Sequence, residues 1–213
     1  MMADQDCEPG GITECPNLRV LVCKGNKIPV LFGLHYCEML TRIDCSNNSL
    51  VSLFGINGCP ELKWFDCSGN RPETLVCGTD PCTLEFLNCS DCGLENLEHI
   101  EMYPELRKLV CDNNGLTKLD GIEACEHLEK LSCTGNQIVS LDPLAQCQKL
   151  KKLLVHGNCI ESFEPVDSLP NLKHTDMSGS IVCDEDCTCQ QVRMLKHLQR
   201  TLASVGGTLH YPS

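Results

Sequence analysis

The sequence lacks the features that usually identify a membrane protein, a secreted precursor or a nucleic-acid-binding protein. It has no apolar run near the roughly 18 residues that a membrane-spanning helix needs. Its first residues, Met1 to Cys7, lack the basic and apolar regions of a secretory signal. Basic residues are scarce, since 17 lysines and arginines against 29 aspartates and glutamates give a net charge of −12. This balance argues against non-specific binding to nucleic acid or to an anionic membrane.

Catalytic motifs are absent as well. The chain has no P-loop, no GxGxxG, no HExxH and no GxSxG. Residues Cys187 to Arg193 have the C-x5-R spacing of cysteine phosphatases, but they lack the glycines that let such a loop close around a phosphate. They also run into an expected helix. The sequence therefore predicts no catalytic residue, no cofactor and no enzymatic activity.

Aromatic residues make up only 4% of the chain, whereas cysteine occurs 19 times in 213 residues. So many cysteines would suggest a disulfide scaffold, unless their positions have another explanation. That explanation is a repeat of 22 residues, defined by the leucines at 18, 40, 62, 84, 106, 128, 150 and 172. Self-similarity at a fixed period of this length is typical of a solenoid, and the chain length fits a single domain.

The columns of the repeat have a simple physical interpretation. Three residues after each leucine comes another apolar residue, except at Thr175, and five residues after come Cys23, Cys45, Cys67, Cys89, Cys111 and Cys133. This alternation predicts a short strand with one buried face, and successive strands should pair in parallel. Eight residues after the leucine, asparagines are expected to form a structural ladder that caps buried backbone groups: Asn26, Asn48, Asn70, Asn114, Asn136 and Asn158.

The segments Leu18 to Ile28 and Leu128 to Ile138 read LxxLxCxxNxI, which resembles the leucine-rich-repeat motif with cysteine in place of the third leucine. The resemblance covers about residues 15–182. The repeat length resembles that of the cytosolic subclass, found in the regulatory leucine-rich subunit of type-one protein phosphatase and in the dynein outer-arm light chain. Bacterial internalin-type surface proteins share the length.

The resemblance implies an α/β solenoid, a right-handed coil with a concave parallel β-sheet and a convex side of mostly 3-10 or irregular structure. We accordingly expect a short N-terminal cap at residues 1–14, eight repeats at 15–182 and a C-terminal cap at 183–213. Apolar residues at three- and four-residue spacings predict a helix at about 188–205 in this cap, and residues 208–211 could add a last strand.

Most of the cysteines are therefore predicted to be core residues. Besides the six in the strand column, five lie three residues before a repeat leucine, namely Cys15, Cys37, Cys59, Cys125 and Cys147. Stacked cysteines would have parallel Cβ atoms about 4.8 Å apart, whereas a disulfide needs about 3.8 Å. Buried free thiols indicate a reducing compartment, so the sequence predicts a cytoplasmic protein.

Two groups of cysteines fall outside this explanation. Cys183, Cys187 and Cys189 lie beside three acidic residues, but no fourth ligand stands at a recognised spacing, so we predict no metal site while leaving the alternative open. Cys77 and Cys82 flank an irregular segment at 76–81, and they could be free or bridged.

The exposed face of the sheet carries the candidate binding residues. Trp64 and Phe86 occupy strand positions that alternate with those of the core residues, so they are expected on the exposed face. They lie on adjacent predicted strands close to Arg42, Asp44 and Asp66. This composition is typical of a binding hot spot, although cross-strand packing alone could also explain the aromatic pair.

The two positions after each repeat leucine hold nine basic residues and only two acidic ones, Glu85 and Glu129. The basic strip predicts an acidic partner surface, with solvated lysines as the alternative, and its proposed contacts are Arg107, Lys108, Lys130, Lys151 and Lys152.

Together these observations predict a non-catalytic protein-binding scaffold or regulatory subunit that uses the concave sheet, resembling the phosphatase regulator or the dynein light chain. Two alternatives stay open: a leucine-rich protein of an RNA particle, with the lysines on phosphates, and an extracellular internalin-like adhesion repeat, with most cysteines bridged.

Overall fold

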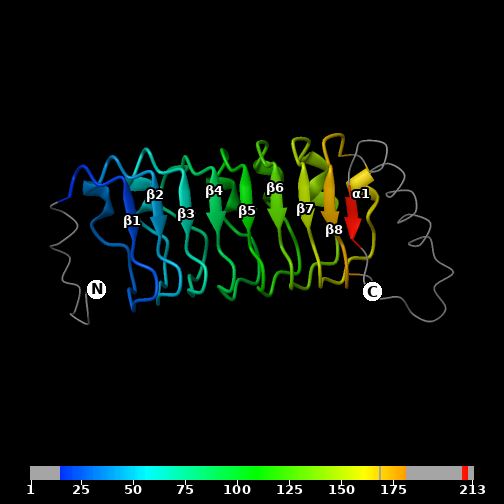
Figure 1. The fold of residues 1–213 in the computed structure, drawn as a ribbon, viewed down its shortest axis with the longest axis horizontal. Coiled ribbons are helices and arrows are strands. Elements are labelled where there is room, and N and C mark those ends of the chain that lie inside the picture. The colour runs from blue at the N-terminus through cyan, green and yellow to red at the C-terminus, as the bar shows by residue number, and fades with distance from the viewer. Residues whose placement is uncertain (1–14, 168, 181–207, 211–213) are drawn as a thin grey trace.

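The computed structural model describes residues 15–167, 169–180 and 208–210, and these form one parallel sheet with its strands in chain order (Figure 1). Each strand pairs with the next in register, one repeat later, so that Trp64 lies opposite Phe86. The strands are β1 (Val20–Val22), β2 (Arg42–Asp44), β3 (Trp64–Asp66), β4 (Phe86–Asn88), β5 (Lys108–Val110), β6 (Lys130–Ser132), β7 (Lys152–Leu154), β8 (His174–Asp176) and β9 (Thr208–His210). β9 falls within the segment for which the sequence suggested a last strand, whereas the helix expected at about 188–205 lies outside the described residues.

Short helical turns line the side of the coil opposite the sheet, as expected for a solenoid of this class. They are η1 (Leu34–Tyr36), η2 (Ile56–Gly58), η3 (Ile100–Met102), η4 (Ile122–Ala124) and η5 (Asp142–Gln146), all 3-10 helices, followed by the one-turn helix α1 (Glu164–Asp167). Gly55 precedes η2 with φ 106°, a left-handed conformation that a residue with a side chain rarely adopts. The predicted parallel sheet backed by 3-10 turns is confirmed.

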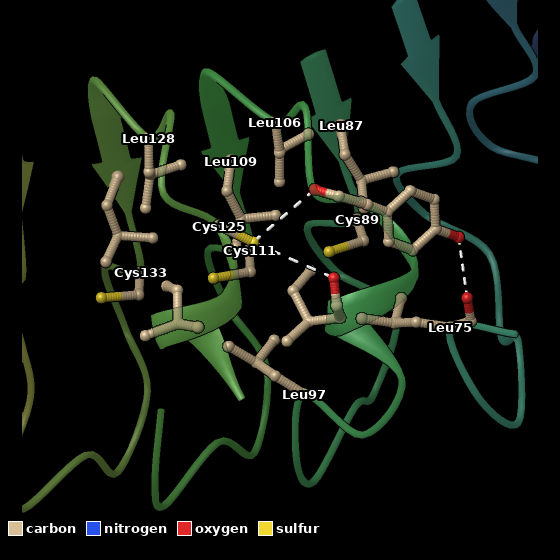
Figure 2. Packing of buried hydrophobic residues seen from close by; sticks show 14 of the residues in the cluster. Leu75, Leu87, Cys89, Leu97, Leu106, Leu109, Cys111, Cys125, Leu128 and Cys133 are labelled. Carbon is tan, nitrogen blue, oxygen red and sulfur yellow. Dashed lines mark hydrogen bonds between the residues drawn. The ribbon is translucent and has the colours of Figure 1, made fainter. Parts of the chain in front are cut away.

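The cysteines of the strand column pack in the core between the sheet and the helical turns. Figure 2 shows Cys89, Cys111 and Cys133 stacked in successive coils. Their thiols donate to carbonyl oxygens of the next coil, with Cys111 Sγ 3.3 Å from the Ser132 oxygen. In the other cysteine column, three residues before the repeat leucine, burial raises the pKa of Cys59 and of Cys147 to about 11. Such thiols remain protonated near neutral pH and behave as small apolar side chains.

The asparagine column forms a continuous ladder of hydrogen bonds along the stack. In the central example, the Nδ2 of Asn136 donates to the carbonyls of Cys111 and Cys133 at 3.0 and 2.9 Å. Its Oδ1 accepts the backbone N–H of Leu116, at 3.1 Å, from the preceding coil. The ladder asparagines from Asn48 to Asn158 each link their own turn to the previous one, which satisfies backbone groups that are shielded from water. Asn26, in the first coil, bonds only to carbonyls of its own turn.

One hydrogen bond of this ladder lacks both its acceptor and its donor. Cys92 stands where an asparagine is expected, and its thiol donates to the Cys67 carbonyl at 3.3 Å, as an asparagine amide would. A thiol has no carbonyl oxygen to accept the N–H from the preceding coil. That N–H is also missing, because the position that donates in other repeats (Leu50, Leu94) is Pro72, which has no N–H. The missing acceptor and the missing donor compensate for each other.

The back of the third repeat is irregular for a reason visible in the sequence. Gly78 stands at the position that Ile56 and Ile100 occupy at the start of η2 and η3, and residues 72–82, all described, contain no 3-10 helix. In the next coil Tyr103 replaces the cysteine of other repeats. Its buried hydroxyl reaches back and donates to the Leu75 carbonyl at 2.7 Å, the contact drawn beside Leu75 in Figure 2.

Replacing Tyr103 by phenylalanine should lower the free energy of unfolding by about 1–2 kcal/mol, because the Leu75 carbonyl would stay buried without its donor. Urea unfolding followed by circular dichroism measures this difference. Tyr36→Phe is the matched control, since Tyr36 is 52% exposed, and its cost should stay within about 0.5 kcal/mol. Equal costs for the two variants would contradict a structural role for the buried hydroxyl.

Candidate functional site

Four side chains form a continuous stack across the exposed face of the sheet. Arg42, Trp64, Phe86 and Lys108 follow one another in register on β2 to β5. The rings of Trp64 and Phe86 are nearly parallel, at 4°, with centroids 4.8 Å apart. The Arg42 guanidinium lies 3.3 Å from the Trp64 ring centre, and the Lys108 ammonium lies 4.7 Å from the Phe86 ring centre. The ring faces are therefore covered by cross-strand and cation–π contacts, while both side chains remain half-buried and present the rest of their surface outward.

The carboxylates of Asp44 and Asp66 have an internal role that the sequence reasoning missed. The Oδ1 of Asp66 accepts from the backbone N–H and the hydroxyl of Ser68, at 3.0 and 2.6 Å, and Asp44 does the same with Ser46. The second oxygen of Asp66 accepts from Asn88, at 3.0 Å. These contacts shape the turns that leave β2, β3 and β4, and the signal for them is the repeated Asp/Asn-Cys-Ser triplet.

Charges just before the strands pair with one another. Glu85 lies 3.7 Å from both Lys63 and Arg107, and Glu129 lies 2.9 Å from Arg107 and 2.6 Å from Lys151. The hydrogen bonds from Lys151 and then Arg107 lower the pKa of the half-buried Glu129 carboxyl. Such surface pairs add little stability. They do offset part of the positive charge of three members of the basic strip, Lys63, Arg107 and Lys151. Sequence reasoning treated Arg107 and Lys151 as partner contacts.

The other three proposed contacts of the strip form a row of like charge. Lys108, Lys130 and Lys152 are direct register partners on β5, β6 and β7. Among the described residues no carboxylate forms an ion pair with Lys130 or Lys152. Like charges directly opposite one another destabilise a sheet, and neighbouring strands lie only about 4.8 Å apart. We call these three residues the lysine row. It is a concentrated cationic feature on an otherwise acidic chain.

Half-buried apolar residues border the lysine row on the same face. Val110 and Leu154 lie two residues further along β5 and β7, with Ser132 between them on β6. The face thus combines positive charge, apolar surface and the adjoining aromatic stack. This combination can bind an acidic and partly apolar surface without any chemical reaction.

A second exposed apolar feature lies behind the sheet and was also missed. Phe32 and Phe54 stand 22 residues apart and are 66% and 61% exposed. The later repeats place acidic residues at the same position, Glu98, Asp120, Asp142 and Glu164. The switch from aromatic to acidic along one column is visible in the sequence once the repeats are aligned.

The cysteine cluster Cys183, Cys187 and Cys189, the C-x5-R segment and the expected C-terminal helix lie outside the described residues. Within the part that the structure describes, no group of three or more histidine, cysteine or acidic side chains is arranged to hold a metal ion. No helix in that part is long and apolar enough to cross a membrane.

Comparison with known proteins agrees with this architecture. The family described as Leucine Rich repeats (2 copies) matches residues 104–146 and 126–172. The crystal structure of internalin C2 from Listeria monocytogenes is similar with a TM-score of 0.70 and 20% sequence identity, over 82% of this chain and 77% of that one. The internalin inlF from the same organism gives a TM-score of 0.67 and 15% identity, over 95% of this chain and 63% of that one. A search of curated proteins by sequence gave no match. Structural likeness at such low identity establishes the fold.

Proposed function

We propose that this leucine-rich-repeat solenoid is a non-catalytic scaffold or regulatory subunit that binds a protein through the exposed face of its sheet. Leucine-rich repeats generally serve as protein-binding scaffolds, and the single observation that supports this site is the lysine row. Three lysines are held side by side on successive strands, although their mutual repulsion opposes the fold. A partner that supplies negative charge would relieve that repulsion on binding.

The partner that fits the face best is an acidic helix with some apolar residues. Each strand contributes one lysine to the row, and neighbouring strands lie about 4.8 Å apart. Helix residues three or four positions apart lie about 5–6 Å from one another on one face, so a line of glutamates or aspartates can match the row. Val110 and Leu154 would then meet the apolar part of the helix. The Trp64–Phe86 stack adjoins the row through Lys108 and would serve as the anchor at its end.

We further propose a cytoplasmic location and a role like that of the phosphatase regulator or the dynein light chain. The support is the state of the cysteines, because those of the strand column from Cys45 to Cys133 are buried free thiols. Buried free thiols suit a reducing compartment. An extracellular adhesion repeat would instead need most of its cysteines bridged, and a thiol titration of the unfolded protein separates the two locations.

Reversing two charges of the lysine row, in Lys130→Glu/Lys152→Glu, should weaken partner binding by roughly tenfold or more, because attractive contacts become repulsive. The partner would be captured from native lysate with the wild-type protein, and its affinity for each variant would then be measured by calorimetry. Lys24→Glu/Lys118→Glu is the matched control, since it changes the net charge equally on exposed residues outside the strands.

The outcomes of this comparison are distinct. Equal loss in the control would mean that net charge, and not the lysine row, governs binding. Unchanged binding by the row variant together with a loss in Trp64→Ala/Phe86→Ala would move the site to the aromatic stack. If the captured species is RNA, with an affinity that falls steeply with salt, the protein-binding proposal is wrong and the RNA-particle alternative replaces it.

A further inference from the structure

Cys77 and Cys82 lie in direct contact at the irregular back of the third repeat. The Cys82 thiol donates to the Cys77 sulfur, and the two sulfur atoms are 2.7 Å apart. Cysteines of the strand column are arranged differently, because Cys45 and Cys111 donate their thiols to carbonyl oxygens of the next strand. The contact between Cys77 and Cys82 is therefore not a consequence of the repeat pattern.

The local backbone explains how these two thiols meet. Stacked column cysteines are held on parallel strands, whose Cβ spacing of about 4.8 Å is too long for a disulfide. Cys77 and Cys82 are only five positions apart on a segment without helical hydrogen bonds, and the turn between them can bring the side chains face to face. Both are buried, at 0% and 6% exposure, but residues 79–81 between them are exposed.

We propose that Cys77 and Cys82 are an oxidative modification site, at which hydrogen peroxide or a similar two-electron oxidant forms a reversible disulfide. In the first step the Cys77 sulfur attacks one peroxide oxygen, the O–O bond breaks, and Cys77 becomes a sulfenic acid with release of water. In the second step the Cys82 sulfur attacks the Cys77 sulfur. The S–O bond breaks, and the hydroxyl leaves as a second water with the Cys82 proton. The two thiols lose two electrons and the peroxide gains them.

The order of attack follows from the hydrogen bond between the thiols. Cys82 donates to the Cys77 sulfur, and this contact lowers the pKa of Cys77 while it raises that of Cys82. The thiolate is the reactive form, so Cys77 is the nucleophile and Cys82 resolves the sulfenic acid. A small oxidant suits this site, since both sulfurs lie below the surface.

Peptide mass spectrometry of the oxidised full-length protein tests this proposal directly. Cleavage after glutamate and after basic residues releases residues 74–85, which contain Cys77 and Cys82 as their only cysteines. The folded protein is exposed to peroxide until the exposed Cys159 is oxidised, then unfolded in N-ethylmaleimide. We expect the 74–85 peptide to be unalkylated and lighter by about 2 Da, and dithiothreitol to restore two alkylation sites. The buried Cys111, on peptide 109–118, should remain fully alkylatable.

Two results would overturn the proposal. The first is that both Cys77 and Cys82 are still fully alkylated when Cys159 has been oxidised. The second is that Cys77 and Cys82 each carry oxygen adducts but no disulfide joins them. Single variants test the order of attack. In Cys82→Ser the Cys77 sulfenic acid should accumulate and react with dimedone, whereas in Cys77→Ser residue Cys82 should stay reduced. The wild-type peptide decides the main question even if a variant folds poorly.

Discussion

Replacing Asn136 by alanine should lower the free energy of unfolding by about 3–5 kcal/mol. The side chain is only 6% exposed, and it satisfies two carbonyls and one N–H that alanine cannot reach. Each buried backbone group left without a partner costs about 1–3 kcal/mol. The loss falls between two coils in the middle of the stack, where the stability of the solenoid depends on contacts between neighbours.

Asn26→Ala is the control for this prediction, because the same residue type occupies the same column at the exposed end. Asn26 donates to the carbonyls of Cys23 and Lys24, and water can replace those bonds. Its cost should be about 1 kcal/mol or less. Urea unfolding followed by both circular dichroism and the fluorescence of Trp64, the only tryptophan, measures each variant. Similar losses at both positions would show that the ladder acts within each turn and not between coils.

The fold could be predicted from the sequence because the period and the side-chain parity are both strict. Once the leucines are aligned, the strand position, the buried face and the in-register pairing of Trp64 with Phe86 all follow. Short 3-10 turns could be expected from the resemblance alone. The irregular third repeat could be located, and Gly78 accounts for its missing helical turn, but the contact from Tyr103 of the following repeat to the Leu75 carbonyl could not be predicted.

The candidate site was less accessible to sequence reasoning, because its character depends on where long side chains point. Counting charges near the strands identified a basic strip, but the geometry divides it into paired and unpaired residues. Glu85 and Glu129 are the only two carboxylates of the strip, yet each lies between two basic side chains and offsets part of their charge. Asp44 and Asp66 likewise look available in the sequence, whereas their oxygens accept hydrogen bonds from the serines that follow the strands. The lysine row emerges only after these pairs are removed.

A double-mutant cycle at Pro72 and Cys92 should show a coupling free energy of about 2–3 kcal/mol in favour of the double variant. Cys92→Asn alone introduces a buried amide oxygen with no N–H to accept, because residue 72 is proline. Pro72→Leu alone introduces a buried N–H that faces a thiol. Each single variant therefore leaves one polar group unsatisfied, at a cost of about 1–3 kcal/mol. The double variant supplies both partners of a bond between residues 72 and 92, equivalent to the one that joins Leu50 to Asn70 at 2.8 Å.

Urea unfolding of the four proteins gives the coupling, and Cys92→Asn combined with Pro60→Leu is the matched control. Pro60 is exposed and takes no part in the ladder through its nitrogen, so that pair should be additive within about 0.5 kcal/mol. Additive costs for Pro72 and Cys92 would mean that the two exceptions arose independently and that water satisfies each of them. A large coupling would instead show that the ladder tolerates a missing rung only when donor and acceptor are lost together. The choice of residue at a ladder position would then depend on the residue 20 positions earlier, because the repeat places that residue's backbone N–H against the ladder side chain.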